Sequence, residues 1–213
     1  MLNDSDYCAP TIYDAYLAAR VVVYAEPTVE PIDTEEVMDE RRNDDDSDVL
    51  GIARRVTAAR QKVEADTGRA LITQTLDIYF DEFPDSRELW IPRPRLATVA
   101  SVTTYDTSDV ATVWSSTNYL VDTASEPGRI VLNASSAWPT GLRRANGIKV
   151  RVAAGYGATG DSVPSLLKQA MHLLIGQYDE HRENVIVAQF AGQFLELPHG
   201  YEDCIAPYRV MVF

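Results

Sequence analysis

A run of glycines at residues 155–160 has the spacing of a nucleotide-binding loop. The residues read Gly-Tyr-Gly-Ala-Thr-Gly, which matches the G-x-G-x-x-G pattern that lets a backbone turn approach a dinucleotide pyrophosphate. Such a site needs a helix that begins directly after the turn, yet Asp161 and the residues up to Pro164 delay the helix and place a carboxylate where phosphate would lie. We therefore predict that these glycines form a flexible connection from a sheet to a helix, and we expect no cofactor.

The acidic stretch before residue 49 offers a second candidate, a calcium loop. Asp44, Asp46 and Asp48 have the spacing of the first, third and fifth ligands of such a loop. The sixth position requires glycine and is Val49 here, and the twelfth requires glutamate and is Arg55. We interpret the stretch as a solvated loop without a metal, whose acids complement the positive end of the helix that follows.

Histidines and paired acids are the remaining candidates for catalysis or metal binding. The three histidines are His172, His181 and His199, and neither of the two in helical sequence has a second histidine three or four residues away. Glu180 and Glu183 share a helix face, but glycosidases place their two acids across a cleft. The chain also lacks the nucleophile-elbow, zinc-helix and phosphate-loop motifs. We predict no catalytic residue and no metal site, and an enzyme remains open only if distant residues assemble its site.

Three tryptophans fall in strand-like segments of the chain. Trp90, Trp114 and Trp138 could form a platform on which sugar rings stack, which would make this a carbohydrate-binding module. Aromatic side chains are also the ordinary filling of a half-buried sheet, so core packing is the preferred interpretation. A carbohydrate-binding module and a dinucleotide-binding enzyme both stay as alternative classes of function.

Negative charge dominates the chain and gathers near its start. The 213 residues hold 19 Lys and Arg against 32 Asp and Glu, a net charge of −13. Residues 1–48 contain fourteen of the acids and three of the bases, so residues 49–213 are nearly neutral. Tight binding of duplex DNA depends on neutralising phosphates with Lys and Arg, and this balance argues against a protein that grips DNA.

Bulk composition is that of an ordinary soluble globular protein, with 46% hydrophobic and 24% charged residues. The start of the chain lacks the basic and apolar regions of an export signal, and the apolar segment 15–25 is short and contains Arg20. Cys8 and Cys204 are the only cysteines, too few for a disulfide framework. We expect no membrane span, and a reducing cytoplasm while the chain is made.

Helical patterns lie toward both ends of the chain. Capping residues predict a short helix from Thr34 to Arg41. Apolar residues at helical spacing predict a second helix from Asp48 to Thr67, with Gly68 as its C-terminal cap. A third helix, apolar on several sides, is predicted from Pro164 to about Arg182.

Short alternating segments fill the middle third of the chain. No helical pattern separates them, so they predict antiparallel strands at the spacing of a meander and exclude a doubly wound parallel sheet. We predict an α+β fold in which the N-terminal helices and the long C-terminal helix form a helical body, with an antiparallel β-rich domain inserted between them. The predicted parts are an N-terminal extension at 1–28, acidic loop and helices at 29–70, the β-rich domain at 71–160, and the central helix with the tail at 161–213. The predicted strands are residues 75–80, 88–91, 98–105, 111–114, 118–121, 129–132 and 148–154.

The end of the chain is apolar, which is unusual because free termini tend to be polar and mobile. We expect it to be pinned either to the core of its own chain or to a neighbouring subunit, and both readings stay open. The candidate partner-interface residues are Tyr208, Arg209, Val210, Met211, Val212 and Phe213.

A string of short motifs runs through residues 29–213 in a definite order, while residues 1–28 lie outside it. After the acidic helix-loop-helix come residues 59–71 (ARQKVEADTGRAL), 90–94 (WIPRP), 119–122 (YLVD), 128–130 (GRI), 150–157 (VRVAAGYG), 164–170 (PSLLKQA) and 206–209 (APYR). This order resembles the head-tail connector (adaptor) family of tailed bacteriophages, prophages and gene transfer agents.

The resemblance implies a virion structural protein without catalytic activity. It implies a homo-oligomeric ring, usually of twelve copies, that joins the portal protein to neck stopper or tail proteins at the head-tail junction and lets DNA pass without tight binding. The two long helices would form the ring wall, the β-rich domain would project toward capsid or tail, and residues 208–213 would contact the portal or the adjacent subunit. The chain would stay in the host cytoplasm during assembly. A neck stopper or tail-completion protein of the same particle is the nearest alternative.

Overall fold

The computed structural model describes residue 16 and residues 18–41, 49–180 and 200–210. It contains α-helices and antiparallel sheets, which confirms the predicted α+β class. The described residues divide into a helical unit, within 28–72 and 156–210, and a β unit, within 16–27 and 73–155. Among the helices described, none is long and apolar enough to cross a membrane.

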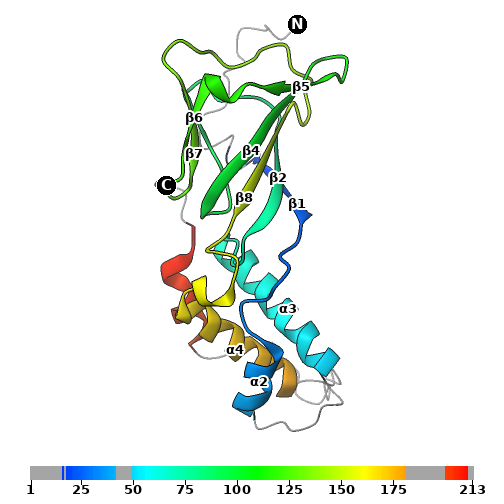
Figure 1. The fold of residues 1–213 in the computed structure, drawn as a ribbon, viewed down its shortest axis with the longest axis vertical. Helices are drawn as coiled ribbons and strands as arrows, with labels where there is room; N and C mark the ends of the chain where they lie inside the picture. The colour runs from blue at the N-terminus through cyan, green and yellow to red at the C-terminus, as the bar shows by residue number, and fades with distance from the viewer. Residues whose placement is uncertain (1–15, 17, 42–48, 181–199, 211–213) are drawn as a thin grey trace, which may run out of the picture. The chain divides into compact units, whose positions relative to one another are not determined.

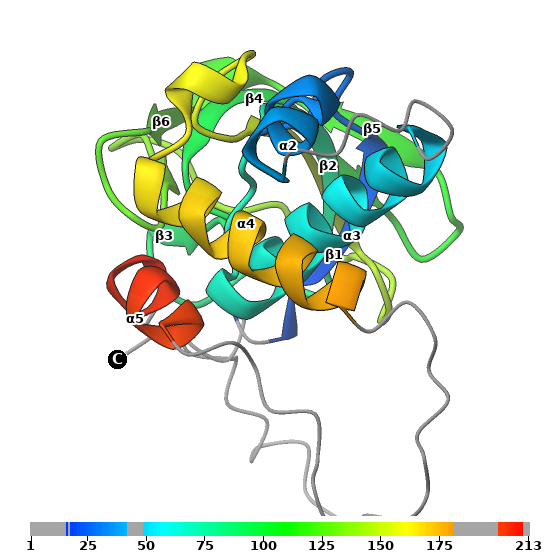
Figure 2. The same cartoon turned by 90° about the horizontal axis from the view of Figure 1, so that it is seen from below.

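The helical unit is built around two long helices that lie side by side, α3 and α4, with α5 packed against both (Figure 2). The α2 and α3 helices match their predicted bounds to within a residue, and α4 begins directly after Pro164 as expected. Residues 181 and 182 of the predicted helix lie outside the described residues. The elements are α2 (Thr34–Arg41), α3 (Val49–Thr67), η4 (Gly160–Ser162), α4 (Ser165–Glu180), α5 (Tyr201–Ile205) and η5 (Ala206–Tyr208).

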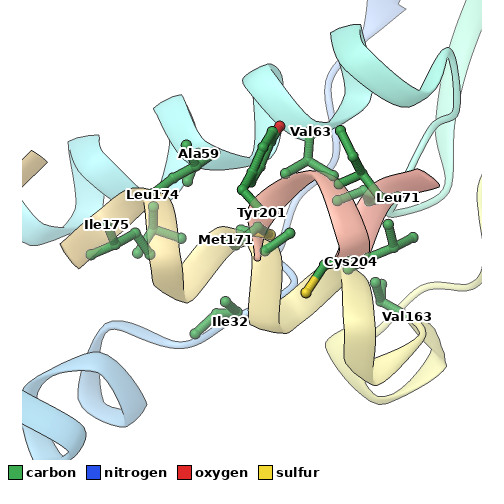
Figure 3. Packing of buried hydrophobic residues seen from close by; sticks show 14 of the residues in the cluster. Ile32, Ala59, Val63, Leu71, Val163, Met171, Leu174, Ile175, Tyr201 and Cys204 are labelled. Atoms are coloured by element: carbon green, nitrogen blue, oxygen red, sulfur yellow. The ribbon is translucent and has the colours of Figure 1, made fainter. Parts of the chain in front are cut away.

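The apolar stripe of α3 forms one wall of the core in this unit. Figure 3 shows Ala59 and Val63 of α3 facing Met171 and Leu174 of α4, with Tyr201 of α5 between the two helices. All five side chains are buried. Burial of a large apolar side chain stabilises a fold by about 1.5–3 kcal/mol, so this layer holds the helix pair together.

A buried arginine on α3, Arg60, connects α3 to the segment before α2 and, through Glu64, to the segment after α3. The Arg60 guanidinium donates from Nε to Glu30 Oε2 at 2.7 Å and from Nη1 to Glu64 Oε2 at 3.1 Å. The other oxygen of Glu64 accepts the backbone amide of Leu71 at 2.8 Å. A buried charge is tolerated only when it is paired and hydrogen-bonded, and this network meets that condition.

The β unit holds two antiparallel sheets (Figure 1). The larger sheet has five strands in the order β1-β2-β8-β4-β5, and the smaller has three in the order β3-β7-β6. The strands are β1 (Arg20–Ala25), β2 (Gln74–Phe80), β3 (Glu88–Trp90), β4 (Leu96–Tyr105), β5 (Ala111–Trp114), β6 (Tyr119–Asp122), β7 (Arg129–Leu132) and β8 (Ile148–Ala154), with a 3-10 turn, η3 (Ser116–Asn118), before β6.

Two features of these sheets differ from the sequence expectation. Strand β1 lies within residues 1–28, where no strand was predicted because the apolar run 21–23 does not alternate with polar residues. It pairs with β2 along five residues. The order is also not that of a simple meander, because β8 lies between β2 and β4. The residues of β8 alternate between buried and half-buried, as suits a strand with a neighbour on each side. The spacing of strands along the chain does not reveal which strand takes that central place.

One face of the larger sheet carries an ion pair beneath an aromatic ring. Arg151 of β8 donates from Nε and Nη2 to the two oxygens of Asp77 on β2, each at 2.7 Å. The Tyr24 ring of β1 lies 3.5 Å from the guanidinium carbon of Arg151. The hydrogen bonds from Arg151 lower the pKa of Asp77 despite its burial. This stack links the three neighbouring strands across one face.

Candidate functional site

The C-terminal segment, the candidate interface, is anchored by a buried tyrosine at the start of α5. The Tyr201 hydroxyl donates to Asp66 Oδ2 at 2.6 Å, and Lys62 Nζ donates to the same carboxylate at 2.6 Å. Burial and the bond to Asp66 raise the pKa of Tyr201. Burial alone would raise the pKa of Asp66, but the hydrogen bonds from Lys62 and Tyr201 outweigh it and lower that pKa. The α5 helix is therefore fixed to the end of α3.

The first half of the candidate interface is bound to its own chain. Arg69 Nε donates to the carbonyl oxygen of Tyr208 at 2.5 Å, and the Val210 amide donates to the carbonyl oxygen of Thr67 at 3.0 Å. Arg209 Nη2 forms an ion pair with Glu202 of α5 at 2.7 Å. The Tyr208 ring packs against the buried core of the helical unit. These contacts hold the segment along the C-terminal end of α3.

The other half, Met211, Val212 and Phe213, lies outside the described residues. The structure thus supports pinning to the chain's own core for Tyr208 and Val210, while contact with a neighbour stays a prediction for the last three residues. Gly68 ends α3 with φ +71°, a left-handed conformation that favours glycine. The Val210 side chain lies beside it at ordinary contact distance, since a Cβ at this position would lie 3.6 Å from a Val210 methyl carbon.

The glycine motif at 155–160 serves close packing. Gly155 has φ +144° and donates its amide to the carbonyl oxygen of Arg95 at 2.9 Å. A Cβ on Gly157 would collide with the Ser162 side chain, and one on Gly160 would collide with the Pro31 carbonyl. The turn is followed by η4, which contains Asp161, so the motif does not lead straight into the N-terminus of α4. The helix therefore begins several residues after the glycines, so its N-terminus does not directly follow the turn as a phosphate-binding loop requires.

Two of the three tryptophans pack into one aromatic cluster that joins the two sheets. Trp138 stacks on Phe83 with ring centroids 4.5 Å apart, and Trp114 stacks on Tyr119 at 5.2 Å. The Trp138 indole donates to the carbonyl oxygen of Ser86 at 2.7 Å. Phe83 and Tyr119 are buried and both tryptophans are half-buried, as expected for core aromatics. Trp90 lies on β3, where its indole donates to Glu88.

His172 is the one sequence-predicted histidine that the structure describes. Its Nδ1 lies 2.5 Å from Glu40 Oε2 and its Nε2 lies 3.7 Å from Glu36 Oε1, so it links α4 to α2. No group of three His, Cys, Asp or Glu side chains suited to a metal occurs among the residues described. Asp44, Asp46 and Asp48 lie outside the described residues, as do His181, His199, Glu183 and Cys8, and the side chain of Glu180 is also not described.

Exposed apolar side chains gather on outer strands of the β unit, and sequence reasoning missed them as a candidate surface. Val22, Val23 and Tyr24 are exposed on β1, and Val113 is exposed on β5. Leu120 and Val121 of β6 are exposed as well. The run of β-branched residues at 21–23 was a usable signal, but it was interpreted only as a segment too short to cross a membrane.

Comparison with known proteins gives a match at the level of fold. No protein-family model matches the chain. No curated protein matches it either. A chain from the neck of an empty gene transfer agent particle, computed with C6 symmetry, superposes with a TM-score of 0.72 at 21% identity, over 91% of this chain and 97% of that chain.

Two further solved structures agree with this match. A chain from the virion of a native gene transfer agent particle has a TM-score of 0.69 at 21% identity, over 91% of this chain and 97% of that one. A chain from the neck of a native particle, computed with C12 symmetry, has a TM-score of 0.64 at 22% identity, over 89% and 97% of the two chains. The chain therefore shares nearly its whole fold with these particle proteins.

Proposed function

We propose that this chain is a structural subunit of the neck of a tailed particle, a head-tail connector that forms a ring through which DNA passes. The observation that carries the proposal is the fold match, which covers 97% of the length of chains from the neck of gene transfer agent particles. The ordered motifs at residues 29–213 resemble the connector family independently of the superposition.

The same comparison supports a ring. Two of the similar neck structures were computed with C6 and C12 symmetry, and we infer a homo-oligomeric ring for this chain. The copy number of twelve comes from the resemblance to the connector family. A closed ring with cyclic symmetry requires two different complementary surfaces on each copy. The ring would lie between the portal protein and the neck stopper or tail proteins, in the virion, after assembly in the host cytoplasm.

Surface fit, with no bond-making chemistry, is the proposed mode of action. The net charge of −13 suits a conduit, because a ring that neutralised many phosphates would hold the duplex in place. Packing of Gly157 and Gly160 against neighbouring side-chain and backbone atoms supports a structural role for the glycine motif. We accordingly infer no cofactor, no metal and no catalytic activity.

Co-expression with the portal protein of the same particle tests the proposal. We expect a complex that elutes as one species, with a mass equal to the portal plus a ring of this chain. We also expect no melting shift with NAD or ATP, whereas a ligand at a hundred times its Kd would stabilise the chain by about 2.7 kcal/mol. A chain that stays monomeric, does not bind the portal and melts at a higher temperature with NAD or ATP would refute the proposal. If electron microscopy of the complex instead placed this chain one protein layer further from the portal, it would be a neck stopper.

A further inference from the structure

The two edges of the five-stranded sheet are both open and apolar. In the described part of the chain, β1 pairs only with β2 and β5 pairs only with β4, so each has one side without a strand. Val22 of β1 is 52% exposed and Val113 of β5 is 68% exposed. An open edge with exposed apolar side chains is a template for pairing with another strand.

The strand directions allow these two edges to meet. Every pairing from β1 through β2, β8 and β4 to β5 is antiparallel, and four reversals give β1 and β5 the same direction. An edge of one copy can thus lie beside the opposite edge of the next copy as a parallel pair. The two surfaces differ, so the contact is heterologous and can repeat around a closed ring.

Charge at the starts of the two strands is complementary. Arg20 is the first residue of β1, and its side chain is 52% exposed while it pairs with Asp81. Asp109 precedes β5 by two residues, and its side chain is 75% exposed while it pairs with Arg143. In a parallel arrangement these ends lie together, so a cation on one edge would face an anion on the other.

The smaller sheet lacks this pair of surfaces. Its β6 edge exposes Leu120 and Val121, but at its other edge, β3, Leu89 is buried and no large apolar side chain is exposed. A sheet that continues from copy to copy needs an open edge on each side of one sheet. In the residues described, only the five-stranded sheet has large apolar side chains exposed at both of its edges.

We propose that β1 of one copy adds to β5 of the next, so that the five-stranded sheets of neighbouring copies join into one continuous sheet around the ring. This inference rests on the proposed ring and names the surfaces that close it. It does not involve the C-terminal segment. The occupant of each edge is a second copy of this chain.

Cysteine cross-linking within assembled complexes tests the pairing. The full-length chain, carrying Cys8→Ser, receives Val22→Cys and Val113→Cys together or singly, and portal complexes are treated with a short bifunctional maleimide. We expect the double variant to give a ladder of covalent oligomers up to the copy number of the ring. On a denaturing gel, each single variant should run as an uncross-linked monomer. A mixture of the two single variants should give covalent dimers and no larger species. Dimers of the Val22→Cys variant alone would mean that β1 pairs with itself, and would overturn the inference.

Charge substitution gives an independent readout. Val113→Asp should reduce ring formation at least tenfold while the melting temperature stays within a few degrees, whereas Leu120→Asp, at an exposed position of β6 in the smaller sheet, should leave rings intact. Rings that form normally, without cross-links and without an effect of Val113→Asp, would overturn the strand pairing and leave the proposed function standing. Failure of the unsubstituted chain to join the portal would overturn the proposed function, and this inference with it.

Discussion

At the scale of single residues, the polar groups of this chain stabilise its fold through buried or half-buried pairs. The Tyr201 hydroxyl is the clearest case, because it is buried and donates to a carboxylate that Lys62 also binds. A hydrogen bond to a charged group contributes about 1.5–3 kcal/mol. Its loss should be measurable without disturbing the surrounding packing.

Tyr201→Phe removes only this hydroxyl. We expect the free energy of unfolding to fall by about 2 kcal/mol, because the half-buried Asp66 carboxylate loses a hydrogen-bond donor. Chemical denaturation of the full chain measures the change. In an Asp66→Asn background the same substitution should cost clearly less, and equal costs in both backgrounds would show that the two groups are not coupled.

Asp77 makes stability depend on acid pH. Its folded-state pKa is lowered by the hydrogen bonds from Arg151, so the unfolded chain binds more protons as pH falls below the ordinary aspartate pKa of about 3.9. The stabilisation is therefore present above that value and is lost as pH falls through the lower, folded-state pKa. Asp77→Asn should lower stability at pH 7 and flatten its decline below pH 4. In an Arg151→Gln background, which lacks the two hydrogen bonds to Asp77, the same substitution should change the pH profile much less; equal flattening in both backgrounds would contradict the assignment.

The sequence shows whether a motif has the residue types that a ligand site needs, but it does not show which side chains the fold brings together. The missing glycine and glutamate argued against a calcium loop, and the delayed helix argued against a dinucleotide site, both from spacing alone. Burial of Arg60 with Glu30 and Glu64 could not be predicted, because Glu30 lies thirty residues from Arg60 and is brought to it only by the fold.

At the scale of elements, close approach of segments explains the glycines better than ligand binding does. Gly160 lies against the Pro31 carbonyl in the helical unit, and Gly157 lies against Ser162. Their spacing resembles a nucleotide fingerprint because both kinds of structure need backbone without a side chain.

Gly160→Ala tests this explanation. The added Cβ would collide with the backbone oxygen of Pro31, and we expect a loss of about 1–3 kcal/mol in unfolding free energy. Gly141→Ala is the matched control, since it has φ +72° and no atom within 4 Å, and it should cost about 1 kcal/mol through backbone strain alone. A Gly160→Ala chain as stable as the unsubstituted one would contradict the packing role.

The C-terminal segment divides into an anchored part and a part that we predict to bind a partner. A chain that ends at Val210 keeps the bonds of Tyr208 and Val210 to the end of α3. We expect it to melt at the same temperature as the full chain but to associate less with the portal or with its own copies. Pull-down with the portal measures this, and unchanged assembly would remove the last three residues from the interface.

Elements with a strong pattern were predictable, and their partners were not. The stripe on α3 and the alternation in β8 gave nearly correct bounds, because burial on one or both faces fixes the spacing of apolar residues. Strand β1 and helix α5 were missed. The first has no alternation and the second has only five residues, too few for a helical period to show. Strand order depends on contacts across the fold, which local patterns do not encode.

At the scale of the whole molecule, the central claim is that this chain works as one subunit of a ring in the neck of a particle. The acidic balance, the open edges of the larger sheet and the fold shared with neck chains all favour it. None of these features requires a reaction. The acidic balance argues against tight binding of DNA, and the open apolar edges argue for association with another chain.

Electron microscopy of the assembled particle, with this chain carrying a small tag, is the most direct measurement. The account predicts tag density repeated with cyclic symmetry around the DNA channel at the junction of head and tail. Particles whose neck lacks the tag, while the tagged chain stays behind as a free monomer, would contradict the account.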